Sequence, residues 1–362
     1  MKSYKIGRVA GIDILLHSTF VWLILFVVIS VSVFDFALIL PSLLFLAFLF
    51  GSVLFHELSH SLVAKLQGIP VHKITLLPIG GIAEMNIDDI APSKEFLISI
   101  AGPLFNFVIC FIIFSLYLVF PQIFPPLGKD VGFVALMLSY PLYELFYINL
   151  VLGMFNLFVP AIPMDGGRVL RALLQFKYNH YKATLISAKV SMALAFAMFL
   201  IGFLLPEWRL LLIISIFVYL GAQSEAQFAR VKHILSGAYA KDVVQAYFPV
   251  IPRNVPITEA ISFLERNLLT SALIDTPHGF KIIFLQDLLN SQPTSQLSDL
   301  ARDVPLFSLN TPLSKIYNYF ATHPDVSLVP VVENGQLYGV VTQDMMDKYY
   351  SIRALVVSSN EA

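Results

Sequence analysis

Charged side chains are scarce in this sequence of 362 residues. Only 13% of the residues are Asp, Glu, Lys or Arg, whereas soluble domains carry about 25%. The formal net charge is −1 and there is no basic tract, so the chain lacks the electrostatic feature that attracts nucleic acid. The single cysteine, Cys110, excludes both a disulfide within one chain and a zinc site made of several cysteines.

Apolar residues are abundant instead, and they are concentrated in the first part of the chain. They make up 57% of the sequence. Residues 1–230 contain 26 charged side chains, whereas the much shorter segment 231–362 contains 21. About 20 apolar residues cross a hydrocarbon core, and uncharged runs predict six membrane spans near 14–34, 38–63, 96–120, 132–158, 184–205 and 209–228. We therefore expect a polytopic α-helical membrane protein followed by a more polar region.

The positions of Lys and Arg predict the orientation of this protein in the membrane. Of the 15 basic residues up to position 232, all but Lys129 and Arg209 fall on the same side of the predicted spans. Basic residues collect on the cytoplasmic side of membrane proteins. We therefore expect a multi-pass cell-membrane protein whose termini and polar region are cytoplasmic.

The polar region contains an internal repeat. Residues 242–260 align with 299–316, and residues 279–289 align with 337–346, at an offset of 56–57 residues. Short β-branched runs and amphipathic helices indicate an α+β unit, and two copies are expected to pack as a pseudo-symmetric pair. The predicted organisation is a membrane domain over 1–230, a linker over 231–240, and two repeats over 241–298 and 299–356.

The clearest chemical signal is the sequence His56-Glu57-Leu58-Ser59-His60, late in the second predicted span. Residues i and i+4 share one face of a helix, so His56 and His60 can bind one metal ion while Glu57 reaches a water molecule beside it. Zinc lowers the pKa of a bound water from 15.7 to about 7, and a nearby glutamate then serves as general base. We therefore expect a zinc hydrolase site inside the bilayer, near its cytoplasmic side.

Two histidines leave such a site incomplete, because a catalytic zinc ion usually has three protein ligands. Asp165 is the best third ligand, since two prolines end the fourth span just before it, on the side that carries the histidines. The other candidates are Glu144, His72, Glu84 and His17. A hydrogen bond to a neighbouring helix explains Glu144 better than metal binding does, and a structural role suits His17.

Several motifs together resemble the site-2 protease family of intramembrane metalloproteases. HELSH matches the HExxH of that family, and FNLFVPAIPMDGGR (155–168) matches its Asn…Pro…Pro-x-Asp-Gly-Gly motif. IAGPLFN (100–106) resembles its Ala-Gly-Pro…Asn element, and LLPIGGIAEM (76–85) resembles its Gly-Gly hairpin. The resemblance spans roughly residues 8–228.

This resemblance implies roles for individual residues. His56, His60 and Asp165 would be the ligands of one zinc ion per chain, and Glu57 would be the general base. The match departs from the common pattern by one additional residue between Asn156 and the following proline. Asn156 is therefore only a candidate for holding the substrate or the oxyanion.

Two neighbouring elements have less specific sequences. The stretch HKITLLPIGGIAEM (72–85) has a strand-like texture, and its edge could bind the amides of an unwound substrate helix; an ordinary cytoplasmic hairpin is the alternative. Gly102, Pro103 and Asn106 of the third span are expected to be helix-packing residues, since small residues let helices approach one another.

The repeated tail resembles a pair of CBS domains, modules that often bind adenine nucleotides between their two copies. In the second copy, Gly339-Val-Val-Thr342-Gln-Asp344 resembles the Gly…Thr…Asp motif of that family. In the first copy Asp287 remains, but Phe284 replaces the threonine. The resemblance implies an adenine nucleotide at Thr342, Asp344 and Asp287 with one site lost, or else a dimerisation module without a ligand and a homodimeric protein.

These observations predict an intramembrane zinc metalloprotease that cleaves transmembrane segments of other membrane proteins, with the CBS pair as a regulatory or dimerisation module. A CBS-gated transporter or channel is the main alternative, but the membrane part has no inverted repeat of the kind transporters show. A membrane protease of another HExxH class would more often use glutamate than Asp165 as its third ligand. An inactive adaptor disagrees with the intact Glu57.

Overall fold

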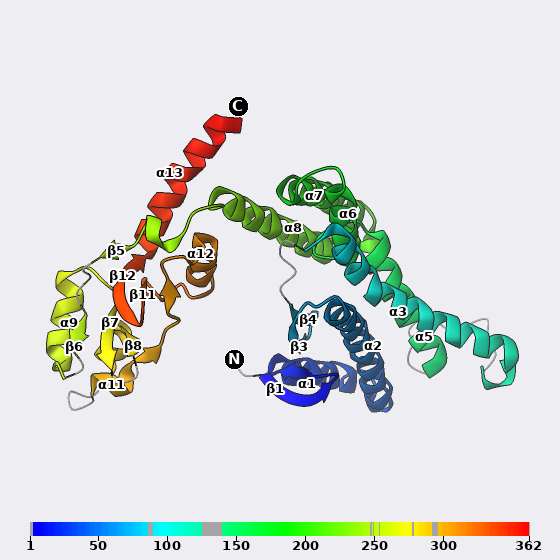
Figure 1. Cartoon of the computed structure of the whole chain (residues 1–362). Helices are drawn as coiled ribbons and strands as arrows, with labels where there is room; N and C mark the ends of the chain where they lie inside the picture. Colours follow the sequence, from blue (N-terminus) through cyan, green and yellow to red (C-terminus); the bar gives the residue numbers. More distant parts are fainter. Residues whose placement is uncertain are drawn as a thin grey trace. The chain divides into compact units, whose positions relative to one another are not determined.

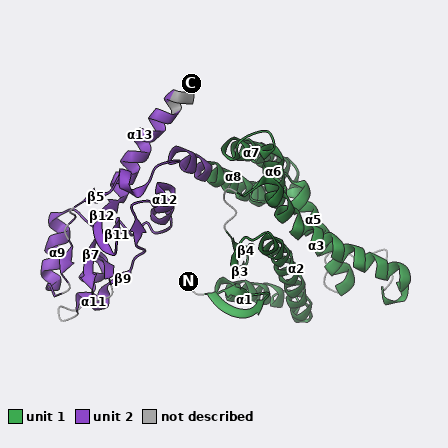
Figure 2. Cartoon of the chain, in the orientation of Figure 1, with its two compact units in different colours: residues 1–226 green, residues 227–362 purple. Residues whose placement is uncertain are grey.

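The computed structural model describes most of the chain. It covers residues 3–85, 90–124, 140–246, 248, 250–252, 254–276, 279–291 and 296–361. The chain forms two compact units, Met1–Ala226 and Gln227–Ala362 (Figure 2). The boundary between them falls within helix α8 (Leu210–Ile234), a few residues before the domain end predicted at 230.

Long apolar helices make up most of unit 1 (Figure 1). Among the described residues, five helices are long and apolar enough to cross a membrane. They are α2 (Ile39–Leu66), α3 (Pro92–Val119), α5 (Pro141–Phe158), α7 (His180–Leu204) and α8. Large apolar side chains such as Phe111 (70% exposed) and Phe203 (71%) point outward, as lipid-facing residues do. The expected polytopic α-helical class is confirmed.

The first predicted span, 14–34, is wrong in its first residues and in its length. Ile12–His17 form strand β2, and the helix that follows, α1 (Thr19–Ser32), has 14 residues. At 1.5 Å per residue, a helix of that length is about 21 Å long, shorter than a hydrocarbon core of about 30 Å. Hydropathy cannot distinguish a buried apolar strand from the beginning of a helix. Of the fourth predicted span, residues 132–139 lie outside the described residues, and α5 begins with Pro141 at its first turn.

A four-stranded sheet packs on the second half of α2. Its order is β1 (Ser3–Val9), β2, β3 (Val71–Leu77) and β4 (Gly80–Met85). Strands β2 and β3 are parallel, and β3 and β4 form an antiparallel hairpin. Ile12 and Ile74 are fully buried in a core shared with Leu58 of α2. The expected hairpin is thus confirmed within a larger sheet, and in the described part of the chain β4 is an edge strand.

Helix α3 is the central helix of unit 1. It packs against α2, α5 and the short helix α6 (Asp165–Gln175), and α6 packs in turn against α7. Helix α6 is much more polar than its neighbours and follows directly on the turn that ends α5. Helix α3 therefore packs both against α2, which carries the HELSH segment, and against α6, which begins within the PMDGG segment.

Unit 2 has the repeated architecture that the sequence predicts. The helices α9 (Ile257–Arg266) and α12 (Leu313–Thr322) are 56 residues apart, and the hairpins β7–β8 (Ser271–Thr276, Gly279–Phe284) and β11–β12 (Leu328–Glu333, Gln336–Thr342) are 57 apart. Ser271 of the first copy and Ser327 of the second bond through their hydroxyl groups at 2.7 Å. Shorter helices are α10 (Leu285–Leu289) and α11 (Leu297–Leu300), and α13 (Gln343–Glu361) ends the chain.

The two copies also exchange their first strands. Strand β5 (Gln245–Ala246) pairs with β12 of the second copy, and β9 (Arg302–Asp303) pairs with β8 of the first. Strands β6 (Ile251–Pro252) and β10 (Phe307–Ser308) complete the two four-stranded sheets. The exchange makes each sheet depend on the other copy, so the pair is a single structural unit.

Candidate metal centre

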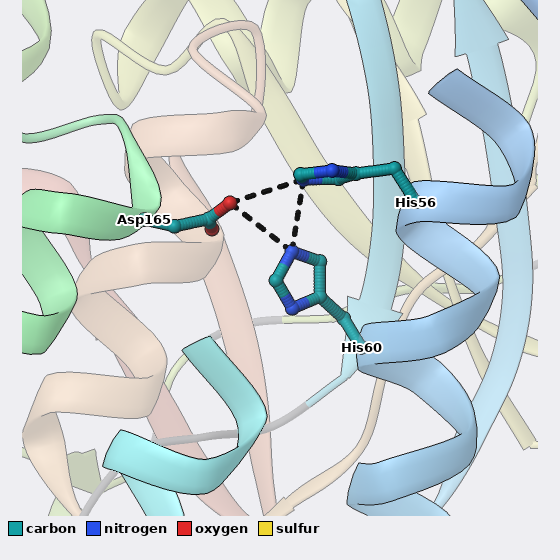
Figure 3. A group of neighbouring side chains, drawn as sticks. All are labelled: His56, His60 and Asp165. Atoms are coloured by element: carbon teal, nitrogen blue, oxygen red, sulfur yellow. Dashed lines mark hydrogen bonds and ion pairs between the residues drawn. The ribbon is translucent and has the colours of Figure 1, made fainter. Parts of the chain in front are cut away.

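Helix α2 presents His56 and His60 on one buried face, one turn apart. Each is 4% exposed. Because the two residues are four positions apart, both side chains lie on the same side of the helix, toward α3. Figure 3 shows the two imidazoles pointing from α2 toward Asp165 on a second helix.

Asp165 is the first residue of α6, and the two glycines after it make that position possible. A Cβ atom on Gly166 would lie 2.4 Å from the carbonyl oxygen of Val159, and one on Gly167 would lie 2.3 Å from the amide nitrogen of Ile162. Any other residue at these positions would therefore separate α6 from the turn before it. Ser191 of α7 accepts a hydrogen bond from the same Ile162 amide at 2.8 Å, which fixes this turn from the other side.

The three side chains form a small triangle of ligand atoms. Oδ2 of Asp165 lies 3.0 Å from Nε2 of His56 and 3.2 Å from Nε2 of His60, and the two nitrogens are 3.1 Å apart. A tetrahedral zinc ion with bonds of about 2.0–2.1 Å holds its ligand atoms about 3.3 Å apart. The observed triangle is close to one face of such a tetrahedron.

The hydrogen bonds made by the Nδ1 atom of each imidazole show which atoms face the centre of the triangle. Nδ1 of His56 lies 2.6 Å from Oδ1 of Asn106, and Nδ1 of His60 lies 2.6 Å from the carbonyl oxygen of Ile98. Since an oxygen of this kind can only accept, each Nδ1 carries the proton and each Nε2 presents a lone pair. With both imidazoles neutral, two lone pairs and a carboxylate oxygen meet with no proton between the nitrogens, an arrangement that a bound metal ion would stabilise.

The charge of Asp165 agrees with this conclusion. Burial raises the pKa of its carboxyl group, but His60 and His56 lower that pKa by more when the imidazoles are protonated, and a cation bound in their place would likewise hold it below its usual range. The carboxyl group is therefore ionised at neutral pH and can act as a metal ligand.

Asn106 belongs to a chain of buried amides that orients His56. Its Nδ2 donates to Oδ1 of Asn149 at 2.8 Å, and Nδ2 of Asn149 donates to Oγ of Ser52 at 3.0 Å. All donors point in one direction along this chain, and Asn106 and Asn149 are 0% and 1% exposed. Such hydrogen bonds fix the tautomer and the ring orientation of a ligating histidine.

The sequence analysis missed the roles of Asn106 and Gly102. A Cβ atom on Gly102 would lie 2.3 Å from Nε2 of His60 and 2.6 Å from Nε2 of His56, so the absence of a side chain leaves room for a metal ion. We expected both residues to pack helices. Their position in IAGPLFN was the available signal, but a spacing of four residues in an apolar span indicates packing just as well.

Glu57 lies beside the sheet and is not part of the triangle. A Cβ atom on Gly81 of β4 would lie 2.5 Å from Cγ of Glu57, so the edge strand passes directly over this carboxylate. Gly80 has a φ of +142°, in the region that favours glycine. The Gly-Gly pair thus brings β4 onto the glutamate of HELSH.

Other candidates for metal binding have different partners. Among the described residues, the group able to hold a metal ion consists of His56, His60 and Asp165. Glu84 forms an ion pair with Lys73 at 2.9 Å, and Nδ1 of His17 bonds to Thr19 at 2.8 Å. Asn156 donates to the carbonyl oxygen of Leu152 in its own helix at 3.1 Å, and a role for it in the reaction stays a prediction. Glu144 is buried at the beginning of α5.

The predicted nucleotide residues of the tail differ in their surroundings. Both carboxylate oxygens of Asp287 accept hydrogen bonds from Arg302, at 2.8 and 2.7 Å. The Arg302 guanidinium also stacks 4.8 Å from the centre of the Phe284 ring. In the second copy, Oγ1 of Thr342 accepts from the amide of Met345, and Asp344 pairs with Lys348 on the exposed surface of α13.

Comparisons with known proteins agree with the geometry. The profile of Peptidase family M50 matches residues 44–137 and 132–200, and the CBS domain profile matches residues 297–352. The zinc metalloprotease MJ0392 of Methanocaldococcus jannaschii is 35% identical over 355 residues, which cover 98% of this chain and 97% of that protein. The solved site-2 protease of the same organism is 40% identical over 62% of this chain and 95% of its own, with a TM-score of 0.44. The chain is therefore a multi-pass membrane metalloprotease that belongs to peptidase family M50, the site-2-protease-like zinc metalloendopeptidases, and it carries a CBS domain pair.

Proposed function

We propose that this protein hydrolyses peptide bonds inside the transmembrane segments of other membrane proteins, and so carries out regulated intramembrane proteolysis. In this proposal His56, His60 and Asp165 hold one zinc ion and Glu57 is the general base. The observation that carries it is the triangle of two imidazole lone pairs and one carboxylate oxygen, built on a helix long enough to span the membrane. Buried ionisable groups in such helices are costly without a function.

The chain supplies the remaining chemistry through its own side chains. A zinc ion at this site would polarise the substrate carbonyl and lower the pKa of an attacking water. Glu57 follows His56 directly and is not needed as a ligand, so its carboxylate is free to accept the proton from that water and later to donate it to the leaving amine. The amide chain from Asn106 to Ser52 keeps the His56 lone pair directed at the site during this exchange.

The sheet edge supports a transmembrane substrate. A peptide bond in a membrane helix is shielded by the hydrogen bonds of that helix, so the helix must unwind before water can attack. An unwound segment can regain backbone hydrogen bonds by adding to an exposed strand edge. Strand β4 offers such an edge directly beside Glu57, because Gly81 lies against that side chain.

The proposed site would lie near one membrane surface. His56 lies ten residues before the end of α2 at Leu66, or about 15 Å along the helix at 1.5 Å per residue. The excess of Lys and Arg in the connections on this side supports a cytoplasmic orientation for the site, both termini and the CBS pair. Cleavage would then occur near the cytoplasmic ends of substrate segments.

The CBS pair would regulate the protease or join two copies of it in a homodimer. If it binds an adenine nucleotide, the second-copy residues Thr342 and Asp344 are the better candidates. Asp287 already has a bidentate partner in Arg302, and Phe284 has no hydroxyl group. A CBS-gated transporter or channel, the main alternative, is disfavoured because the carboxylate of Asp165 meets two histidines at one point among the described residues, as in a metal site.

Purified protein tests the proposed function directly. The full chain would be isolated in detergent, its metal content measured, and its activity assayed on a panel of single-span membrane proteins. We expect about one zinc ion per chain in both the wild type and Glu57→Gln, and cleavage by the wild type only. Ser59→Ala, on the same helix but with its hydroxyl bonded to the Phe55 carbonyl oxygen, is the matched control and should cleave normally. Equal cleavage by Glu57→Gln would refute the proposed mechanism.

A further inference from the structure

Arg171 of α6 lies six residues after Asp165, and its charge is buried. The residue is 4% exposed. Nε and Nη2 donate to Oε1 of Glu95 on α3, at 2.7 and 2.6 Å, and Nη1 donates to Oε1 of Glu225 on α8. A buried guanidinium bonded to two other helices fixes the helix that carries it, because its planar donors demand a definite geometry.

The two carboxylates around Arg171 are not equivalent. The side chain of Glu95 is 2% exposed and also accepts a hydrogen bond from Gln175, so this buried carboxylate has two partners on α6. The side chain of Glu225 is 36% exposed. Water can therefore replace Arg171 as its partner when α8 shifts. Of the two ion pairs, Arg171–Glu225 between α6 and α8 is therefore easier to break than Arg171–Glu95 between α6 and α3.

Helix α8 also contacts the chain on the other side of Asp165. A Cβ atom on Gly221 would lie 2.7 Å from Cδ of Pro163. Val218 is fully buried and packs with Met164 in one cluster. Residues 218, 221 and 225 follow the spacing of a single helix face. One face of α8 therefore holds the metal-ligand segment both before and after Asp165.

The last turns of the same helix belong to unit 2, which contains the CBS pair and is called the CBS unit below. Val231 and Leu235 are 4% and 1% exposed, and they belong to the hydrophobic core that is formed mainly by the second CBS copy. Arg353 of α13 donates to the carbonyl oxygen of Ser236 at 3.1 Å, just beyond the helix end. A change in the packing of this core therefore acts on the end of the helix that carries Glu225.

We propose that Arg171 is a positioning residue for Asp165, and that its ion pair with Glu225 makes the position of this ligand depend on the CBS unit through α8. The proposal rests on the proposed function, in which Asp165 holds zinc. A shift of α8 would loosen α6 and move the carboxylate relative to His56 and His60. The CBS pair would thus control the affinity of the site for its metal without approaching the metal itself.

The rate of zinc release reports on the position of the Asp165 carboxylate without any substrate. Full-length protein in detergent would be loaded with one zinc ion and mixed with an excess of a chelating dye, and the rate of zinc transfer recorded. Glu225→Gln should release zinc up to about tenfold faster than the wild type, no more than the smallest effect of losing a group bonded directly to a ligand, because Glu225 acts through Arg171. Gln223→Ala, two residues away and exposed, should match the wild type. Equal rates for Glu225→Gln and the wild type would overturn the proposed link from Arg171 through Glu225 to α8.

A second pair of variants tests the path through α8. Leu235→Ala loosens the end of α8 in the core of the CBS unit, and it should speed zinc release when Glu225 is present. In the Glu225→Gln background the same change should have no further effect, because the link is already broken. An equal effect of Leu235→Ala in both backgrounds, or none in either, would contradict the proposed path.

The same measurement separates this inference from the proposed function. A wild-type protein that binds no zinc would refute the proposed function, and the inference with it. A wild-type protein that binds zinc and cleaves substrates, but whose zinc release is unchanged by Glu225→Gln, would refute only the inference.

Discussion

The two histidines of HELSH can direct unprotonated nitrogens at one point because each Nδ1 has its own oxygen acceptor. Asn106 serves His56 and the Ile98 carbonyl serves His60. A neutral imidazole has one donor and one acceptor nitrogen, so fixing the proton on one nitrogen frees the other for the metal. The chemistry of the site therefore depends on residues of α3 as much as on the motif itself.

Replacement of the third ligand should remove the metal. Asp165→Asn keeps the shape of the side chain but loses its negative charge, so zinc content or zinc affinity should fall sharply. Glu144→Gln, a matched change at another buried carboxyl of the membrane unit, should leave the zinc content unchanged. Metal analysis of the two purified variants distinguishes them, and loss of zinc from Glu144→Gln alone would show that the wrong carboxylate has been assigned.

The residues around the ligands should matter nearly as much. Asn106→Leu removes the acceptor of the His56 Nδ1 proton and should weaken zinc binding by about 10–100-fold. Gly102→Ala would place a methyl group against both Nε2 atoms and should weaken binding further. Gly51→Ala, a glycine of α2 with open space around it, is the control and should bind zinc normally. Competition with a chelator measures all three affinities, and normal affinity in Asn106→Leu would argue against an orienting role.

The sequence predicted the three residues that meet at the candidate metal site, but not the residues that orient them. HELSH and PMDGG are recognisable because metal ligands of these types at these spacings are rare in apolar segments. Gly102 and Asn106 have no such mark, since a glycine and an amide in a membrane helix pack helices in many proteins. Only the packing of α3 against both α2 and α6 shows that these two residues face the site.

At the scale of elements, the first membrane span was the main error of the sequence analysis. The uncharged run 14–34 is strand β2 followed by the short helix α1. The strand was missed because its uncharged residues continue directly into those of α1, and hydropathy alone does not separate an apolar strand from the beginning of a helix. The repeat in the tail was predictable, since both copies can be aligned in the sequence and their elements keep the same offset in the structure.

Strand β4 should be required for cleavage and not for metal binding. Gly81→Ala would place a methyl group 2.5 Å from Cγ of Glu57, which must displace either the base or the strand edge. We expect zinc to be retained and cleavage of a single-span substrate to fall by at least about 100-fold, the contribution of a general base. A variant with normal turnover would show that neither the close approach of β4 nor the placement of Glu57 matters.

At the scale of the whole molecule, the CBS pair should bind at most one adenine nucleotide per chain. Asp287 is neutralised by Arg302, whereas Asp344 lies on an exposed helix surface. Titration of the full-length protein with ATP should therefore show a single site that Asp344→Ala abolishes and Asp287→Ala alters little. Two equal sites, or one site indifferent to Asp344→Ala, would refute this assignment, and absence of binding would favour the dimerisation role.

The position of the cleaved bond tests the central claim most directly. Zinc-loaded wild-type protein and Glu57→Gln would be incubated with a single-span membrane protein in lipid vesicles, and the products identified by mass spectrometry. We predict that the wild type cuts a peptide bond inside the transmembrane segment, near its cytoplasmic end, and that Glu57→Gln gives no such product. Cleavage confined to residues outside the membrane segment, or identical products from Glu57→Gln, would contradict the account.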